Sequence, residues 1–204
     1  MITIAQATSY NTALSDIPGL LLPALGQTLA MVGIAMSVAV LLGTPLGVLL
    51  HNLAPGGLFT HLTGYTVISW VANIGRSLPF LVLMAAIIPF TRWVTGTNIG
   101  IAGAVVPMAI AGTFFFARLV QNCLREVPAS VTQATRASGG STWQIIRTAQ
   151  LGEAVPGLIG ALTFNIIAMI EYSAIAGTIG AGGLGYVAIT WRIALDESAG
   201  LGKW

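Results

Sequence analysis

The chain has 204 residues, of which 55% are hydrophobic and only 7% are charged. About a quarter of the residues of a soluble globular domain are charged, so this chain cannot cover the surface of a soluble protein and has the composition of a membrane protein. The net charge of +2 comes from eight basic and six acidic side chains. The basic side chains are not clustered as a nucleic-acid-binding surface requires, so we expect no nucleic-acid partner.

The residue types that carry metal, redox and ATPase chemistry are sparse. Cys123 is the only cysteine, which excludes an intrachain disulfide and a metal or redox cysteine pair. His51 and His61 have no third ligand nearby and do not predict a metal site. Lys203 is the only lysine, so the Gly-Lys-Ser or Gly-Lys-Thr ending of a phosphate-binding loop is missing. We expect a chain that is not an enzyme, binds no cofactor or metal, and takes energy from a partner or an ion gradient.

Four apolar runs can each cross a bilayer, which takes about 20 apolar residues. They lie within residues 20–50, 65–90, 99–117 and 154–179. Glycines spread along the first run would let helices approach closely in lipid. Pro79 predicts a kink within the second run, and residues 52–57, which include Pro55 and two glycines, predict the turn before it.

The segment 126–153 between the third and fourth runs is too polar to lie in hydrocarbon. Four arginines lie in it or beside it: Arg118, Arg125, Arg136 and Arg147. The positive-inside rule then places this segment in the cytoplasm. Since three spans precede it, the N-terminal tail, residues 1–19, is expected outside.

After the fourth run, residues 180–185 read Gly-Ala-Gly-Gly-Leu-Gly, which predicts a flexible, non-helical segment. Residues 192–204 are too few and too charged to form another span and are predicted to be a short polar tail. The expected fold is therefore all-α, a polytopic transmembrane helix bundle over residues 20–191 with four spans.

The polar segment predicts two short helices. Ser141 and Gln144 fit a capping box, so one helix should start just after Gly140 and carry Trp143, Ile146 and Gln150 on one side. Residues 129–138 can form the other helix, and Gly139-Gly140 lets the chain turn between them. Two interpretations stay open: the helices lie on the membrane surface, with Arg136 and Arg147 near anionic headgroups, or they dock on a partner.

The order of motifs in this segment resembles the Glu-Ala-Ala loop of ATP-binding-cassette importer permeases, and looks most like the methionine-uptake branch. The motifs are Glu126-Val-Pro128, the run from Gln133 to Gly139, the run from Gln144 to Arg147 and the run from Glu153 to Gly157. Two further stretches agree: residues 73–80 continuing to 88–92, and Tyr172-Ser173-Ala174 leading into 180–185. The resemblance covers roughly residues 27–191.

The resemblance implies the permease subunit of an importer of an amino acid, with methionine in its D or L form as the expected substrate. It implies a type I permease domain whose coupling loop, residues 126–153, contacts one of two ATPase subunits that hold ATP and Mg²⁺, and an external substrate-binding lipoprotein. Because four or five short helices can hardly enclose a path, we expect a homodimer in the inner membrane. The implied coupling residues are Gln133, Ala134, Thr135, Arg136, Ala137 and Gly139.

Polar and charged residues within the spans are candidates for the translocation path or gate. They are Ser69, Asn73, Arg76, Ser77, Pro79, Glu171, Tyr172, Ser173 and Ile175. The first three fall at i, i+4 and i+7 and predict one polar stripe on the second span, facing the bundle or a cavity. Charges at bilayer depth are costly, so Arg76 and Glu171 either line the route or form an ion pair that joins two helices.

The chain departs from the pattern of the family it resembles at several points. Gln133 stands for the usual Glu, Thr135 for the second Ala, and Leu151-Gly152 for a Leu-Pro. The family's fifth span after the glycines is also expected to be missing, through loss of the helix or through a truncated or shifted reading frame. The alternative function is a small secondary transporter or channel that uses Arg76 and Glu171 as an ion-coupling pair.

Overall fold

The computed structural model describes the backbone of residues 17–198 and the side chains of residues 19–190. Helices occupy nearly all of this range. They are α1 (Ile17–Leu53), α2 (Leu62–Ser77), α3 (Phe80–Ala86), α4 (Ile88–Thr95), α5 (Gly100–Glu126), α6 (Ala129–Ala137), α7 (Thr142–Gln144), the π-helix η2 (Ile145–Gln150), α8 (Leu151–Ala176), the π-helix η3 (Gly177–Ala181) and α9 (Gly183–Ser198). The all-α prediction is confirmed, with no strand in the described range.

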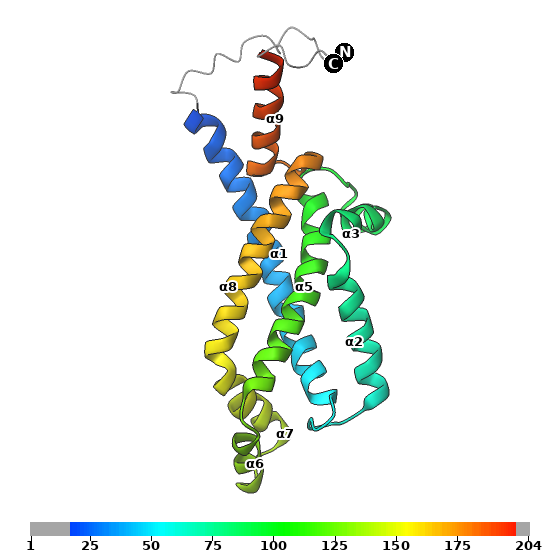
Figure 1. The fold of residues 1–204 in the computed structure, drawn as a ribbon, viewed down its shortest axis with the longest axis vertical. Coiled ribbons are helices and arrows are strands. Elements are labelled where there is room, and N and C mark those ends of the chain that lie inside the picture. The colour runs from blue at the N-terminus through cyan, green and yellow to red at the C-terminus, as the bar shows by residue number, and fades with distance from the viewer. Residues whose placement is uncertain (1–16, 199–204) are drawn as a thin grey trace.

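The long helices α1, α5 and α8 run along the length of the molecule, and α2 lies beside α5 (Figure 1). The short helices α6 and α7 lie at one end, here called the α6 end, and α9 lies with the start of α1 at the other, the α9 end (Figure 1). Three described helices are long and apolar enough to cross a membrane: Gly19–Leu53, Gly100–Glu126 and Thr142–Ala181. A fourth crossing is added if the bent pair of α2 and α3 is one span.

The second predicted span is not one kinked helix over residues 65–90. The helix α2 ends at Ser77, and α3 starts at Phe80 with its axis turned by 107°. Pro79 restricts the residue before it to extended backbone, and Leu78 indeed lies at φ −75° and ψ 131°. Without its N–H, Pro79 also cannot continue the hydrogen-bond ladder. The predicted kink is therefore a complete break.

Small residues bring the long helices into close contact. A Cβ at Gly47 of α1 would lie 2.6 Å from the carbonyl oxygen of Ala117 and 2.6 Å from Cβ of Val120, both on α5. A Cβ at Gly112 of α5 would overlap the methyl group of Met169 on α8. Close approach of this kind drives helix association in lipid, where burial of apolar side chains contributes little between helices.

The glycine-rich segment is a tight turn between two helices, and the prediction of a non-helical stretch over 180–185 is only partly right. The helical path continues to Ala181, and Gly180 and Gly182 adopt φ values of 97° and 86° that favour glycine. The helix α9 then starts at Gly183 and continues through residue 191 to Ser198, so residues 192–198 are not a separate tail. It runs onward beside α1 (Figure 1).

Two side chains of α1 hold the start of α9. Gly183 N–H donates to Oε1 of Gln27 at 2.8 Å, and Leu184 N–H donates to Oγ1 of Thr28 at 3.0 Å. The first amides of a helix have no partner within the helix, so α1 supplies the cap that the Gly-rich sequence cannot. The predicted tail before α1 falls on residues 1–16, outside the described residues, and on the first residues of α1, which begins at Ile17.

Candidate functional site

The α6 helix is a short element with no buried residue. Ser138 N–H donates to the carbonyl of Ala134, and Gly140 N–H donates to that of Thr135, both at 3.0 Å. Gly139 takes the left-handed conformation at φ +80°, which is the usual glycine-based end of a helix. The chain therefore reverses sharply after α6, as the glycine pair predicted.

Most of the predicted coupling residues are exposed on α6 or just after it. Gln133, Ala134, Arg136 and Ala137 are exposed, while Thr135 is half-buried. The Thr135 hydroxyl donates to the carbonyl of Val131 at 3.0 Å. Thr135, which stands where the resembled family has an alanine, therefore satisfies its hydroxyl within α6. It adds no unpaired polar group to the outer surface.

The helix after Gly140 starts with the predicted capping box. Ser141 N–H donates to Oε1 of Gln144 at 2.7 Å, and Gln144 N–H donates to Oγ of Ser141 at 3.3 Å. The predicted common face of Trp143, Ile146 and Gln150 is wrong: Trp143 is 67% exposed and Gln150 is 3% exposed. The π-helical turn η2 lies between them and widens the helix. Positions seven apart therefore no longer share a face.

Gln150 binds Asn52, at the end of α1, through a reciprocal pair of amide hydrogen bonds. Asn52 Nδ2 donates to Oε1 of Gln150 at 3.0 Å, and Gln150 Nε2 donates to Oδ1 of Asn52 at 2.9 Å. Asn52 also donates to the carbonyl of Val48 at 2.9 Å. Buried amides need such partners. The pair fixes the start of the α8 helix, just after α6 and α7, to the end of α1.

A second polar network joins α5 to α1 and α2. Arg118 donates to Oε1 of Gln121 at 2.6 Å and to the carbonyl of Ser69 at 2.8 Å. Gln121 in turn donates to the carbonyl of Leu50 at 3.4 Å. Arg118 is thus half-buried within α5, which continues nine residues past the predicted end at 117. It therefore lies on the helix, before the polar segment that starts at residue 126.

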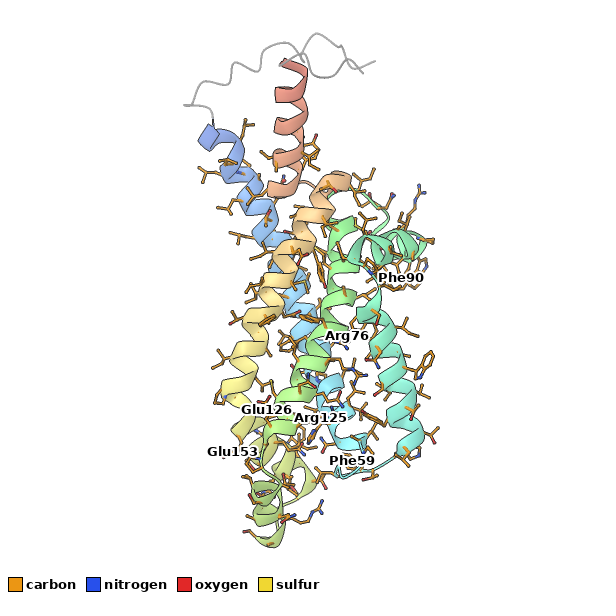
Figure 2. The ribbon with its side chains drawn as sticks, in the orientation of Figure 1. Phe59, Arg76, Phe90, Arg125, Glu126 and Glu153 are labelled. Atoms are coloured by element: carbon orange, nitrogen blue, oxygen red, sulfur yellow. The ribbon has the colours of Figure 1, made fainter. Side chains whose placement is uncertain are left out.

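A cavity of about 180 Å³ lies where α2 breaks. Among its lining residues are Arg76 and Ser77 of the predicted path, Phe80 of α3, Phe115 of α5 and Tyr172 of α8. The Phe80 and Tyr172 rings stack with their centroids 4.5 Å apart. Figure 2 shows Arg76 near the end of α2, beside α5. The wall is therefore aromatic, with one guanidinium.

The other predicted path residues lie outside this cavity. Ser69 is buried against α5, so the stripe that it was expected to form with Asn73 and Arg76 is divided between two surfaces. Asn73 is exposed in a separate shallow hollow with Ser77, and Pro79 is exposed at the break. Ser173 is buried and donates to the carbonyl of Ile170, and Ile175 packs against the core of the bundle.

The hypothesis of an ion pair between Arg76 and Glu171 is wrong for this chain by itself. Both residues lie in the described range, both are exposed, and no salt bridge joins them. An exposed carboxylate on a membrane-spanning helix is too costly to face lipid tails.

Three buried amides were not predicted from the sequence. Asn52, Gln121 and Asn165 are each fully buried; Asn165 donates to Sδ of Met36 at 3.2 Å, and its Oδ1 has no partner. A lone amide within an apolar run was the available signal, because such groups are expensive in a membrane and are normally satisfied. Among the described residues, no cluster of His, Cys, Asp or Glu could hold a metal ion.

Long apolar helices, a cavity lined by aromatic rings and one arginine at a broken helix, and an exposed short helix at one end define a polytopic membrane permease. The family of binding-protein-dependent transport system inner membrane components matches residues 43–203. This chain therefore belongs to that family. As a member it is a transport subunit of the inner membrane rather than an enzyme.

The chain is similar to curated relatives over most of its length. It is 47% identical over 189 residues to the probable D-methionine transport system permease protein MetI of Vibrio cholerae serotype O1, covering 93% of this chain and 81% of that protein. It is 41% identical over 158 residues to the D-methionine transport system permease protein MetI of Escherichia coli K12, covering 78% of this chain and 73% of that protein.

A solved structure of the MetNI methionine ABC transporter in inward-facing conformations has the same fold. Its TM-score is 0.84 at 39% identity, covering 86% of this chain and 81% of that chain. The type I importer permease fold predicted from the motifs is confirmed by this similarity.

Proposed function

We propose that this chain is the membrane-spanning subunit of an ATP-driven importer of methionine, in its D or L form. The names of the two curated relatives and of the solved transporter support this substrate. Two copies would form the path, and each would bind one of two ATPase subunits that hold ATP and Mg²⁺. An external substrate-binding lipoprotein would deliver the amino acid.

The charges at the α6 end support the proposed orientation. Arg125, Arg136 and Arg147 lie in or next to the segment that carries α6, and the positive-inside rule then puts this end in the cytoplasm. The N-terminus would lie outside. The family description as an inner membrane component supports the membrane assignment.

The observation that carries the proposal is the combination of an exposed α6 with a rigid attachment to the bundle. No residue of α6 is buried, so its surface is available to a partner. The Asn52–Gln150 pair joins the helix that follows α6 and α7 to the end of α1. A push on α6 would therefore move α1 and α8 together, which is what a mechanical link to an ATPase requires.

The cavity lined by Arg76 supplies a candidate part of the path. An arginine can bind a carboxylate, and aromatic rings such as those of Phe80 and Tyr172 favour contact with a thioether sulfur. Ser77 lines the same cavity. Asn73, Glu171, Ser173 and Ile175 would then contribute only through movement of the helices or at the contact between the two copies.

The test uses the chain co-expressed with an ABC ATPase from the same genome. We expect the ATPase to co-purify, and methionine uptake into proteoliposomes that contain the external binding protein to require ATP. Reordering residues 133–139 should abolish both, whereas reordering the exposed residues 92–94 of α4 should leave ATPase capture intact. Uptake without ATP would instead support the secondary transporter. Normal uptake after the reordering of 133–139 would refute the coupling role.

A further inference from the structure

A second cavity, of about 320 Å³, lies between α6, the end of α1 and the end of α5. Three basic side chains line it: His51 of α1, Arg125 of α5 and Arg136 of α6. Uncharged polar side chains also line it: Thr132 and Gln133 of α6, and Gln150 of η2. The cavity is separate from the one at Arg76, which lies at the break between α2 and α3.

The charge of this cavity is unbalanced. Two guanidinium groups carry its positive charge, and none of its lining residues is acidic. Arg125 donates to the hydroxyl of Tyr65 at 3.1 Å, which holds the guanidinium in place. Like charges held close together repel, and a bound anion removes this repulsion. Guanidinium groups bind phosphate with several N–H donors at once.

The position of the cavity favours a lipid phosphate over other anions. It lies where α1 and α5 leave the bundle, and Figure 2 shows Arg125 at this end of the long helices. Part of its wall is apolar, formed by Leu58, Leu124 and Val127. A phospholipid at the membrane surface offers both a phosphate for the arginines and glycerol and acyl carbons for the apolar wall. Basic cavities between membrane helices on the cytoplasmic side are known to suit anionic headgroups.

We propose that this cavity binds the phosphate of an anionic phospholipid of the cytoplasmic leaflet. The proposal rests on the cytoplasmic position of the α6 end under Proposed function. Because Arg136 belongs to α6 while His51 and Arg125 belong to α1 and α5, the lipid would bridge the coupling helix to the membrane ends of the bundle. The position of α6 relative to the ends of α1 and α5 would then depend on the anionic lipid around the protein.

The experiment measures lipid binding by native mass spectrometry of the full chain co-purified with its ATPase in mild detergent, with phosphatidylglycerol or phosphatidylcholine added. We expect a strong adduct with phosphatidylglycerol and a much weaker adduct with phosphatidylcholine. Arg136→Gln should weaken the adduct about fivefold, and Arg125→Gln should do the same, because each basic residue contributes about a factor of five near a membrane surface. Arg147→Gln removes the same charge from an exposed position outside the cavity and should leave the adduct unchanged.

Several outcomes would overturn the proposal. Equal binding of both lipids, or equal loss in Arg136→Gln and Arg147→Gln, would show a general surface attraction only. Displacement of the adduct by millimolar inorganic phosphate would indicate a site for a free anion. An adduct on the permease alone that disappears when the ATPase binds would identify the cavity as an ATPase contact. Arg136→Lys, which keeps the charge, should restore most of the adduct, so a folding defect is separable from loss of the site.

The readout is independent of transport. If the ATPase is captured but no lipid adduct forms, the lipid site is refuted while the importer function stands. If no ATPase is captured and the adduct still forms on the permease with the expected variant pattern, the lipid site stands and the importer function is refuted.

Discussion

Asn52 and Gln150 lie 98 residues apart in the chain and exchange two side-chain hydrogen bonds of 3.0 and 2.9 Å. One is at the end of α1, and the other is at the end of the π-helical turn η2 that leads into α8. Their exposed fractions are 0% and 3%, so neither amide can replace its partner with a hydrogen bond to bulk water. This pair joins the segment that contains α6 to the first long helix of the bundle.

Asn52→Leu should destabilise the protein by about 1 to 3 kcal/mol, because Gln150 would keep a buried amide without its partner. The double variant Asn52→Leu with Gln150→Met should recover most of the loss, since both polar groups are then replaced by apolar groups of similar shape. The midpoint of thermal unfolding in detergent would check both. A single variant as stable as the unmodified protein would contradict the buried pair.

Gly47→Ala should destabilise the contact between α1 and α5 by about 1 to 3 kcal/mol, the usual effect of an overfilled interface. The added Cβ would lie 2.6 Å from the carbonyl oxygen of Ala117, with no flexible side chain to give way. Gly33→Ala on the same helix is the matched control, because nothing lies within 4 Å of its Cβ. Chemical unfolding of the two variants side by side should show a loss for the first only.

Thr28→Val should weaken the start of α9 by about 1 kcal/mol, as the loss of a helix cap does. It removes the hydroxyl that accepts the Leu184 N–H at 3.0 Å while keeping the side-chain shape. Hydrogen exchange at the Leu184 amide should become faster. Thr28→Ser keeps the hydroxyl and should exchange like the unmodified protein; equal exchange in all three proteins would mean that the cap contributes nothing.

Arg118→Met should destabilise the protein by about 2 kcal/mol, because the buried Gln121 Oε1 loses a charged donor. The carbonyl of Ser69 loses its donor as well. Arg118→Lys should recover only part of this, since an ammonium group cannot reach two acceptors in the fixed fork of a guanidinium. Arg147→Gln, at an exposed position, should shift the unfolding midpoint little. An equal shift in the Arg118→Met and Arg147→Gln variants would remove the basis for this network.

Much of the fold could be predicted from the sequence because membrane helices are recognisable as uninterrupted apolar runs. The runs that became α1, α5 and α8, the short helix at 129–137 and the capping box at Ser141 all depend on neighbours in the chain. The order of the motifs around α6 likewise identified the family that the comparisons showed. These are local patterns, and a single sequence displays them directly.

The tertiary structure alone decided which polar groups face one another. Pro79 could have kinked a helix or ended it, and only packing against α5 and α8 set the 107° turn. Gln150 turned inward because a π-helical turn shifted its register, and α9 forms from a glycine-rich start because Gln27 and Thr28, 156 positions earlier, accept its first amides. Contacts across such separations depend on the three-dimensional path of the chain. No periodicity within a short window encodes them.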